Sequence, residues 1–430
     1  MNLRPRNIPA FFWRNLSMIF CVMLILGQRF PMARALSSSS SCAAVTATED
    51  VHLIVLVHGW LGNPKEMGYL EKSLSQQARK NNYSVLVHSA ECNNGRTTDG
   101  IAAGGSRLAD EVNSLIKTHT KHNKTLSLSF VGNSLGGLYA RYALSEIDFR
   151  HTQSNSIRPA VFCTTATPHL GVSQHTYIPL PRSAEYVIAN ALQPTGRDLF
   201  RYTSLIQEMT LLDQFTTPLQ AFEHRIAHVN AHQTDFQVPT ATAGFVDPHS
   251  TSLHHVSPPR GENNNMVDAP SFLKLSVNTQ PKEKQREAAE NIVCPNPDNT
   301  RDTSVCNSTH LSELLDSMGW NKLFWDMRPT LPTMVPSFVW TTDASKQPSS
   351  SSLFKSKSTY TSQELYQQYT SFGGSVPFGH TMLVANSKNS LFERLWAGGK
   401  PVMDWVAQDL LERILHLDHA PIDSSQGGAQ

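Results

Sequence analysis

Apolar runs and amphipathic segments alternate along the chain from Val51 onward. VHLIVLVH at 51–58 is a continuous apolar run rich in β-branched residues, as expected of a strand buried on both faces. Comparable runs predict further strands at 84–89, 126–132, 160–165, 224–230 and 336–342. Segments with helical spacing lie between them, including one from Ser106, which we expect to cap that helix. The alternation predicts a mostly parallel sheet covered by helices on both faces.

Two segments interrupt this alternation. Residues 171–222 are rich in apolar and helix-forming residues, which predicts a helical, lid-like insertion. Residues 247–307 are polar and rich in proline, asparagine and histidine, which predicts a long, partly disordered loop. We therefore expect one domain over residues 51–417, followed by a disordered tail at 418–430.

The first 48 residues read as a targeting segment. Arginines precede a short apolar run at 16–26, which is typical of the hydrophobic region of a signal peptide. A serine-rich stretch without acidic residues follows and resembles an organelle transit peptide. We expect entry into the secretory pathway or import into an organelle such as a plastid. The alternative is an uncleaved membrane anchor.

Composition excludes some classes of protein. Among the 430 residues, 40% are hydrophobic, which is enough for a sizeable core. The net charge of +1 gives no basic footprint, so we expect no nucleic-acid partner. Six cysteines are too few for a disulfide framework, although Cys294 and Cys306 could pair in an oxidising compartment.

The residues from Gly132 to Gly136, GNSLG, fit the G-x-S-x-G pattern, in which a serine lies on a sharp turn between a strand and a helix. A predicted strand precedes the motif and an amphipathic helix follows it. The simpler alternative is that Asn133 or Ser134 only caps the helix. Capping does not explain both glycines or the apolar strand, so we predict that Ser134 is a nucleophile.

A glycine turn after the first predicted strand is a candidate oxyanion hole. HGWLG at 58–62 is similar to the HG turn of lipases, in which the N–H after the glycine faces the oxyanion. Here this donor is Trp60, and the N–H of Leu135 is the second candidate. Alone, the segment is equally consistent with a tight turn holding a satisfied histidine. Together with the G-x-S-x-G motif, it predicts an oxyanion hole.

A serine nucleophile needs a histidine base, and 18 histidines compete for that role. After a nucleophile turn of this kind, the acid and then the histidine follow in chain order. His380 lies in a glycine-rich loop near the C-terminus and fits this order. His169 precedes any candidate acid, so we expect it only to support the site.

Several aspartates are candidates for the acid that orients the histidine. Asp235 comes soon after the predicted strand at 224–230, which is the expected position. Asp343 is the second candidate, because it follows the predicted strand at 336–342. Asp213 and Asp247 fit less well, and a loop aspartate is by default a turn residue.

Taken in order, several segments resemble a known family. They are VLVHGWLGN, SAECNNGRTTDGIAAGGSRLADEV, FVGNSLGGLYARYAL, TTATPHLG, GRDLF, VNAHQTDFQVPTATA, MGWNKLFWDM, GHTMLV and GGKPVMDWVAQDLL. This series resembles the putative serine esterase family, lipase-like α/β-hydrolases related to fungal Rog-type lipases, with plant and algal members. The resemblance implies the α/β-hydrolase fold, with Ser134 as nucleophile, Asp235 as acid and, by a looser match, His380 as base.

The family implies hydrolysis of carboxylic esters of lipids through an acyl-enzyme. A lipid or acyl-ester substrate and contact with a membrane surface are the expected partners. No metal or organic cofactor is required, and no paired Cys/His spacing indicates one. Two alternatives remain, namely acyl transfer by the same triad and a non-catalytic binding protein of the same fold.

Overall fold

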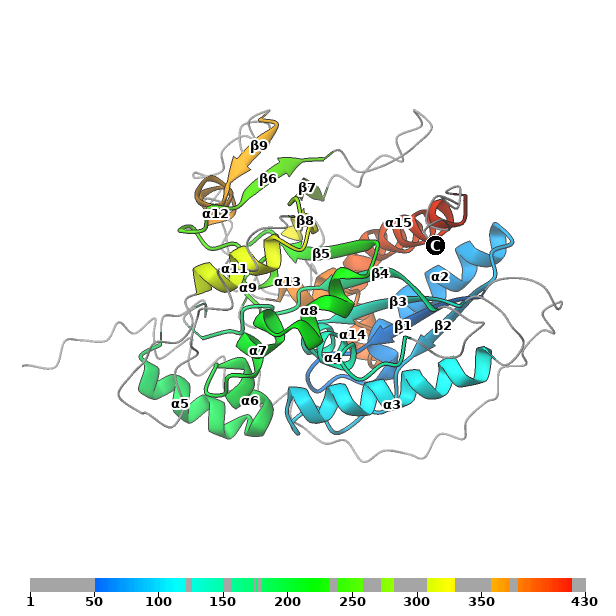
Figure 1. The fold of residues 1–430 in the computed structure, drawn as a ribbon, viewed down its shortest axis with the longest axis horizontal. Helices are drawn as coiled ribbons and strands as arrows, with labels where there is room; N and C mark the ends of the chain where they lie inside the picture. The colour runs from blue at the N-terminus through cyan, green and yellow to red at the C-terminus, as the bar shows by residue number, and fades with distance from the viewer. Residues whose placement is uncertain are drawn as a thin grey trace, which may run out of the picture. The chain divides into compact units, whose positions relative to one another are not determined.

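The central element of the fold is a mixed β-sheet (Figure 1). The computed structural model describes residues 51–120, 126–149, 157–173, 175, 180–232, 235, 238–257, 272–281, 308–328, 357–370 and 378–419. Within these ranges, nine strands run in the order β2-β1-β3-β4-β5-β8-β7-β6-β9. Their bounds are β1 Val51–Val57, β2 Val85–Ser89, β3 Leu126–Asn133, β4 Ile157–Thr165, β5 His224–Asn230, β6 Leu253–Val256, β7 Leu273–Asn278, β8 Asn321–Trp325 and β9 Thr359–Thr361.

The strands from β2 to β8 in this order are parallel. Val57 at the end of β1 pairs with Gly132, and Asn133 at the end of β3 pairs with Thr165 of β4. Thr165 in turn pairs with His228 of β5. The carboxyl ends of these strands therefore meet at one edge of the sheet, where loops from distant parts of the chain come together.

The other end of the sheet is antiparallel and differs from the sequence prediction. The polar segment expected to be a loop at 247–307 contributes β6 and β7, which pair with each other. β8, at residues 321–325, was not predicted, and it takes the parallel position beside β5. These three strands are short and carry polar residues such as His254, Lys274 and Lys322, so their apolar pattern is weak.

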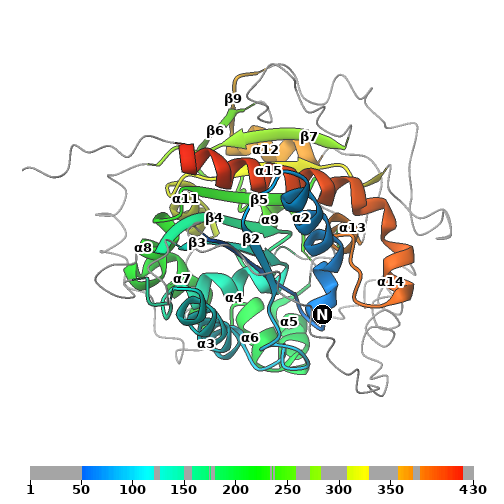
Figure 2. The ribbon, with the colours of Figure 1, turned by 90° about the vertical axis from the view of Figure 1, so that its right-hand side faces the viewer.

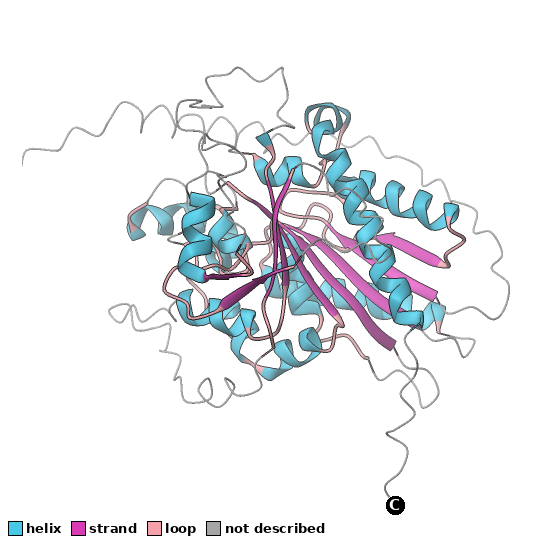
Figure 3. Ribbon diagram, turned by 90° about the horizontal axis from the view of Figure 1, so that it is seen from above, coloured by secondary structure: helices cyan, strands magenta, loops and turns pink. Residues whose placement is uncertain are grey.

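Helices cover both faces of the sheet (Figures 2 and 3). α2 (Gly68–Lys80) and α15 (Lys400–His419) pack on one face, and α3 (Ile101–His119), α4 (Leu135–Ala143), α7 (Leu205–Leu211) and α8 (Asp213–Gln220) pack on the other. β1 shows why both faces need cover, because Ile54 and Leu56 join one core and Leu53, Val55 and Val57 the other. The predicted two-faced architecture is confirmed.

Shorter helices complete the described part of the chain. They are η1 Pro64–Met67, α5 Arg182–Ala191, α6 Gln193–Leu199, α9 Thr240–Ala243, α11 Ser308–Asp316, α12 Ser362–Thr370, α13 Gly379–Leu383, α14 Ser390–Leu395 and η5 Ala397–Gly399. None of the helices that the structure describes has the length and apolar content needed to cross a bilayer.

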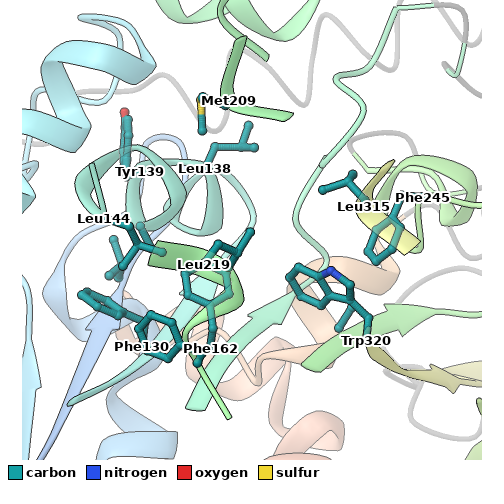
Figure 4. Close-up of a cluster of buried hydrophobic side chains, with 14 of the residues drawn as sticks. Phe130, Leu138, Tyr139, Leu144, Phe162, Met209, Leu219, Phe245, Leu315 and Trp320 are labelled. Carbon is teal, nitrogen blue, oxygen red and sulfur yellow. The ribbon is translucent and has the colours of Figure 1, made fainter. Parts of the chain in front are cut away.

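The predicted insertion at 171–222 is helical, but only its first part has a core of its own. There Val172, Ala189 and Phe200 form a small separate cluster around α5 and α6. α7 and α8 instead belong to the main core, and Figure 4 shows Leu219 of α8 beside Phe130 and Phe162 of the sheet. Therefore only α5 and α6 are separate from the main core, and a lid-like role remains a prediction for these two helices.

α3 begins five residues earlier than predicted, because distant residues cap it. The N–H of Gly100 donates to Thr195 Oγ1 at 2.9 Å, and the N–H of Ile101 donates to Asp198 Oδ2 at 2.8 Å. Both acceptors lie on α6. Ser106, the predicted cap, lies inside the helix, and its hydroxyl donates to Glu146. Helix N-termini need such acceptors, and here the insertion supplies them.

A buried ion pair joins the antiparallel strands to the core. Lys322 of β8 is fully buried, and its Nζ lies 2.5 Å from Asp316 Oδ1 of α11 and 3.7 Å from the ring centre of Phe245. His254 of β6 lies 3.9 Å from the same carboxylate and contacts Ser362 of α12 at 3.0 Å. Burial raises the pKa of Asp316 and lowers that of Lys322, and each charge counteracts the other's shift.

We expect Lys322→Met to lower the free energy of unfolding by about 3–5 kcal/mol, because it leaves the buried Asp316 charge without its partner. The double variant Lys322→Met/Asp316→Leu should recover most of this loss. Urea unfolding measures both. Lys400→Met is the control, because its half-exposed pair with Glu393 should contribute little. Equal losses for Lys322→Met and the double variant would contradict the expectation.

Several predicted features lie outside the described residues. They are the targeting segment at 1–48, the Cys294–Cys306 pair, the strand at 336–342 with Asp343, and most of the tail after 418.

Candidate active site

Ser134 lies on a sharp turn between β3 and α4. Its backbone has φ 52° and ψ −123°, a conformation that L-residues rarely adopt. Such strain costs of order 1–3 kcal/mol and persists only where the surroundings enforce it. The N–H of Ser134 donates to the carbonyl of Thr165 at 2.8 Å, which ties the turn to the end of β4.

The capping alternative for this motif is wrong. Ser134 occupies the N-cap position of α4, but its side chain makes no capping hydrogen bond. The Asn133 side chain is directed elsewhere, donating to Glu66 Oε1 at 2.6 Å and accepting from Thr165 Oγ1 at 2.9 Å. The Ser134 hydroxyl has no hydrogen-bond partner among the residues that the structure describes.

The glycines of the motif allow close packing that a side chain would prevent. A Cβ on Gly132 would lie 2.4 Å from the Cα of Gly137, and one on Gly136 would lie 2.1 Å from the carbonyl oxygen of Val57. Only glycine permits these approaches. The turn therefore packs directly against the end of β1, where the HG segment begins.

Most backbone N–H groups of the HG turn donate hydrogen bonds to neighbouring groups of the protein. Gly59 donates to Glu66 Oε1 at 2.9 Å, Leu61 to Thr97 Oγ1 at 2.9 Å, and Gly62 to the carbonyl of Gly59 at 3.1 Å. The Trp60 N–H has no acceptor within the described ranges. Of the four N–H groups from Gly59 to Gly62, only that of Trp60 is left to receive a ligand atom.

The direction of the Trp60 N–H follows from this bonding. In a trans peptide the carbonyl and the N–H point to opposite sides. Because the Gly59 carbonyl accepts from Gly62, the Trp60 N–H of the same peptide points away from the turn's interior. Leu135 is the first residue of α4, where N–H groups have no partner within the helix. Both N–H groups chosen from the sequence are thus available as donors.

Asp235 and His380 lie together, as the sequence predicted. His380 Nδ1 is 3.4 Å from Asp235 Oδ1, although the ring is not aligned for a hydrogen bond, and the backbone N–H of His380 donates to Asp235 Oδ2 at 2.8 Å. Asn230 and Val238 also donate to this carboxylate, at 3.2 and 3.1 Å. Asp235 is fully buried and His380 is 6% exposed, so the pair is largely shielded from water.

The sheet places this pair and Ser134 at the same edge. Ser134 follows β3 and Asp235 follows β5, with β4 between them. β3, β4 and β5 are parallel, so the loops that follow them open on the same side. The described residues include no hydrogen bond between Ser134 and His380. Catalytic hydrogen bonds are often long in unliganded enzymes and shorten when substrate binds.

The other candidate acids and His169 make contacts that belong to the fold. Asp247 accepts from the N–H of His249 and from Thr309, and Asp213 is the first residue of α8. His169 is fully buried, with Thr164 Oγ1 3.1 Å from its Nε2 and aromatic rings around it. Burial holds the pKa of His169 well below its ordinary value, so it is neutral and packs in the core.

The sequence did not point to Glu66, which contacts both the HG turn and the residue before Ser134. No motif marks it, and a glutamate after a turn usually faces solvent. No group of three or more His, Cys, Asp or Glu side chains able to hold a metal occurs in the described part of the chain.

The class of protein follows from this arrangement. A serine on a strained strand–turn–helix, in a mostly parallel sheet covered on both faces, with an Asp after a later strand and a His beyond it, defines the α/β-hydrolase fold.

Comparisons with known proteins agree with this class. Residues 47–248 match the family described as "Putative serine esterase (DUF676)". This match agrees with the resemblance drawn from the sequence.

Two curated relatives carry the description "Putative lipase". One, from Saccharomyces cerevisiae, is 25% identical over 52% of this chain and 36% of its own length. The other, from Schizosaccharomyces pombe, is 28% identical over 46% of this chain and 26% of its own length. This chain thus spans only about a third of the length of these relatives.

Solved structures align less closely. A gene product of Listeria innocua matches with a TM-score of 0.29 at 14% identity, over 45% of this chain and 77% of its own. Phospholipase PlaB from Legionella pneumophila, in complex with thio-NAD, matches with a TM-score of 0.30 at 11% identity, over 44% of this chain and 41% of its own.

We expect Gly136→Ala to lower the free energy of unfolding by about 1–3 kcal/mol, because the new Cβ meets backbone rather than a movable side chain. Urea unfolding measures the loss. Gly68→Ala is the matched control, since it lies at the start of α2 with φ −60° and its Cβ would meet only Ser387 Oγ at 3.4 Å. That variant should be neutral or slightly stabilised. Similar stabilities for both variants would contradict the close packing.

Proposed function

We propose that this protein is a serine hydrolase that cleaves carboxylic esters of lipids, with Ser134, His380 and Asp235 as its catalytic triad. The observation that carries the proposal is the strained turn at Ser134, beside two backbone N–H groups that have no acceptor among the described residues. A strained non-glycine residue with an unbonded hydroxyl serves no evident structural purpose. The match of residues 47–248 to a family described as a putative serine esterase supports the reaction class.

Each residue has a role in the proposed mechanism. His380 removes the proton of Ser134 as its oxygen attacks the ester carbonyl, and the N–H groups of Trp60 and Leu135 stabilise the oxyanion. The protonated His380 then gives its proton to the leaving alcohol, which yields an acyl-enzyme. Water, deprotonated by His380, cleaves the acyl-enzyme and restores Ser134. Asp235, 3.4 Å from His380 Nδ1, orients the imidazole in both steps once the ring turns so that its Nδ1–H donates to the carboxylate.

The lipid nature of the substrate is supported by the surface of the α5–α6 element. Tyr186 and Val187 on α5 are 56% and 67% exposed, so two neighbouring large apolar side chains of this element face solvent. Such a surface is suited to contact with a membrane or a lipid aggregate. Both curated relatives carry the description "Putative lipase", which fits a lipid ester.

We expect Ser134→Ala to lower kcat on p-nitrophenyl esters by on the order of 10⁴ and to abolish labelling by a fluorophosphonate probe. His380→Ala should cause a comparable loss, because it removes the general base. Asp235→Asn should also be severely impaired, whereas Asp343→Asn should remain close to wild type. A severe loss only in Asp343→Asn would move the acid to that residue, and a labelled Ser134→Ala would exclude Ser134 as the nucleophile.

We expect a comparison of lipids extracted from membranes, incubated with wild type or with Ser134→Ala, to reveal the substrate. Wild type should deplete one class of acyl lipid and release an equal amount of fatty acid, measured by mass spectrometry. Release of a new acylated product in place of fatty acid would indicate acyl transfer. No difference between the two proteins, with p-nitrophenyl esterase activity intact, would contradict a lipid substrate.

A further inference from the structure

Glu66 is a buried carboxylate at the junction of three segments of the site. It lies in η1, directly after the HG turn, and is 3% exposed. Its Oε1 accepts from the backbone N–H of Gly59 at 2.9 Å and from Asn133 Nδ2 at 2.6 Å. Buried carboxylates are rare unless their hydrogen bonds are satisfied, and here both donors belong to the proposed site.

The HG turn closes around this carboxylate. A Cβ on Gly62 would lie 2.2 Å from Glu66 Oε2, so the turn passes the side chain at a distance that only glycine allows. Because Glu66 accepts the Gly59 N–H, and the Gly59 carbonyl accepts the Gly62 N–H, the peptides on both sides of Gly59 are fixed. The second of these peptides carries the Trp60 N–H. Glu66 thereby fixes the direction in which the Trp60 N–H, the proposed oxyanion donor, points.

The contact with Asn133 extends this support beneath the nucleophile. Glu66 accepts from the amide nitrogen of Asn133, whose amide oxygen accepts from the Thr165 hydroxyl at 2.9 Å. The Thr165 carbonyl then accepts the N–H of Ser134. A continuous chain of hydrogen bonds thus leads from the HG turn to the strained residue. Such a chain restrains the backbone of both the HG turn and the nucleophile turn.

The backbone of Glu66 reaches the third segment, which follows the His380 helix. The carbonyl of Glu66 accepts from the N–H of Ser387 at 3.1 Å, and the Ser387 hydroxyl donates to the carbonyl of Lys65 at 2.8 Å. Lys388 lies nearby, where burial lowers its pKa and the negative charge of Glu66 opposes that shift. The segment after α13 is therefore attached to the same residue.

We infer that Glu66 is a positioning residue, which holds the oxyanion turn, the nucleophile turn and the histidine-bearing segment in register without touching the substrate. The inference rests on the proposed esterase function for its effect on turnover. Its structural part, the restraint of three segments, does not depend on that function. The two parts therefore need separate readouts.

The test compares Glu66→Met, which keeps the size but removes the acceptor, with Glu66→Gln, which keeps an acceptor for Gly59. We expect Glu66→Met to lower kcat by about 10²–10³ with little change in KM, as for loss of an oxyanion donor. Glu66→Gln should retain most of the wild-type kcat. Hydrogen–deuterium exchange should become faster in Glu66→Met for peptides covering 58–62 and 132–135, whose contacts use the Glu66 side chain. Peptides covering 386–389 should be unchanged, because the backbone carbonyls of Lys65 and Glu66 that hold Ser387 remain.

Asp404→Leu is the matched control for a lost carboxylate. Asp404 accepts from Tyr69 at 2.9 Å and from Ser73 at 2.7 Å, so it also joins two segments, but these are α2 and α15. This variant should lower the unfolding midpoint without lowering kcat. A fall in kcat no larger in Glu66→Met than in Asp404→Leu would overturn the inference.

If exchange in Glu66→Met is unchanged at both 58–62 and 132–135, the inference is overturned, whatever the activity. If wild type neither cleaves an ester nor reacts with a fluorophosphonate, the proposed function fails. The exchange data still decide whether the Glu66 side chain restrains the two turns.

Discussion

The close approach of the nucleophile turn to the end of β1 is the constraint on which the rest of the site depends. The contact of Gly136 with the Val57 carbonyl leaves no room for a side chain, so α4 begins directly against the HG turn. This approach places two N–H groups of unrelated segments on the same side of the sheet. A displacement of α4 by the width of a methyl group would move the start of this helix away from the HG turn.

Hydrogen bonding within the protein then selects the donors. Around the two turns, the N–H groups of Gly59, Leu61, Gly62 and Ser134 have acceptors, whereas those of Trp60 and Leu135 have none among the described residues. The N–H groups that already have acceptors thus determine which N–H groups remain for a ligand. A buried polar site organised in this way is preorganised, because its dipoles are already oriented before a substrate arrives.

The parts of the site that could be predicted are those with a local signal. The strand, glycines and helix around Ser134 are contiguous, and the chain order of Asp235 and His380 follows from the topology of the sheet. β6, β7 and β8 were missed because short strands with polar residues lack a clear period. Glu66 could not be found, because its role depends on contacts 67 residues away in the chain, to Asn133. Similarly, the start of α3 is fixed by Thr195 and Asp198, which no local rule includes.

The capping of α3 by α6 limits how this fold can change during evolution. The Thr195 hydroxyl accepts from Gly100 and donates to the carbonyl of Thr97, and the Thr97 hydroxyl accepts from Leu61 of the HG turn. An element between two strands of such a fold is usually an exchangeable module, because surface segments tolerate replacement. Here a transplanted segment would uncap a core helix and loosen the oxyanion turn. Under the proposed function, substitutions on the surface of α5 and α6 are therefore a more accessible route to a new substrate preference than exchange of the whole insertion.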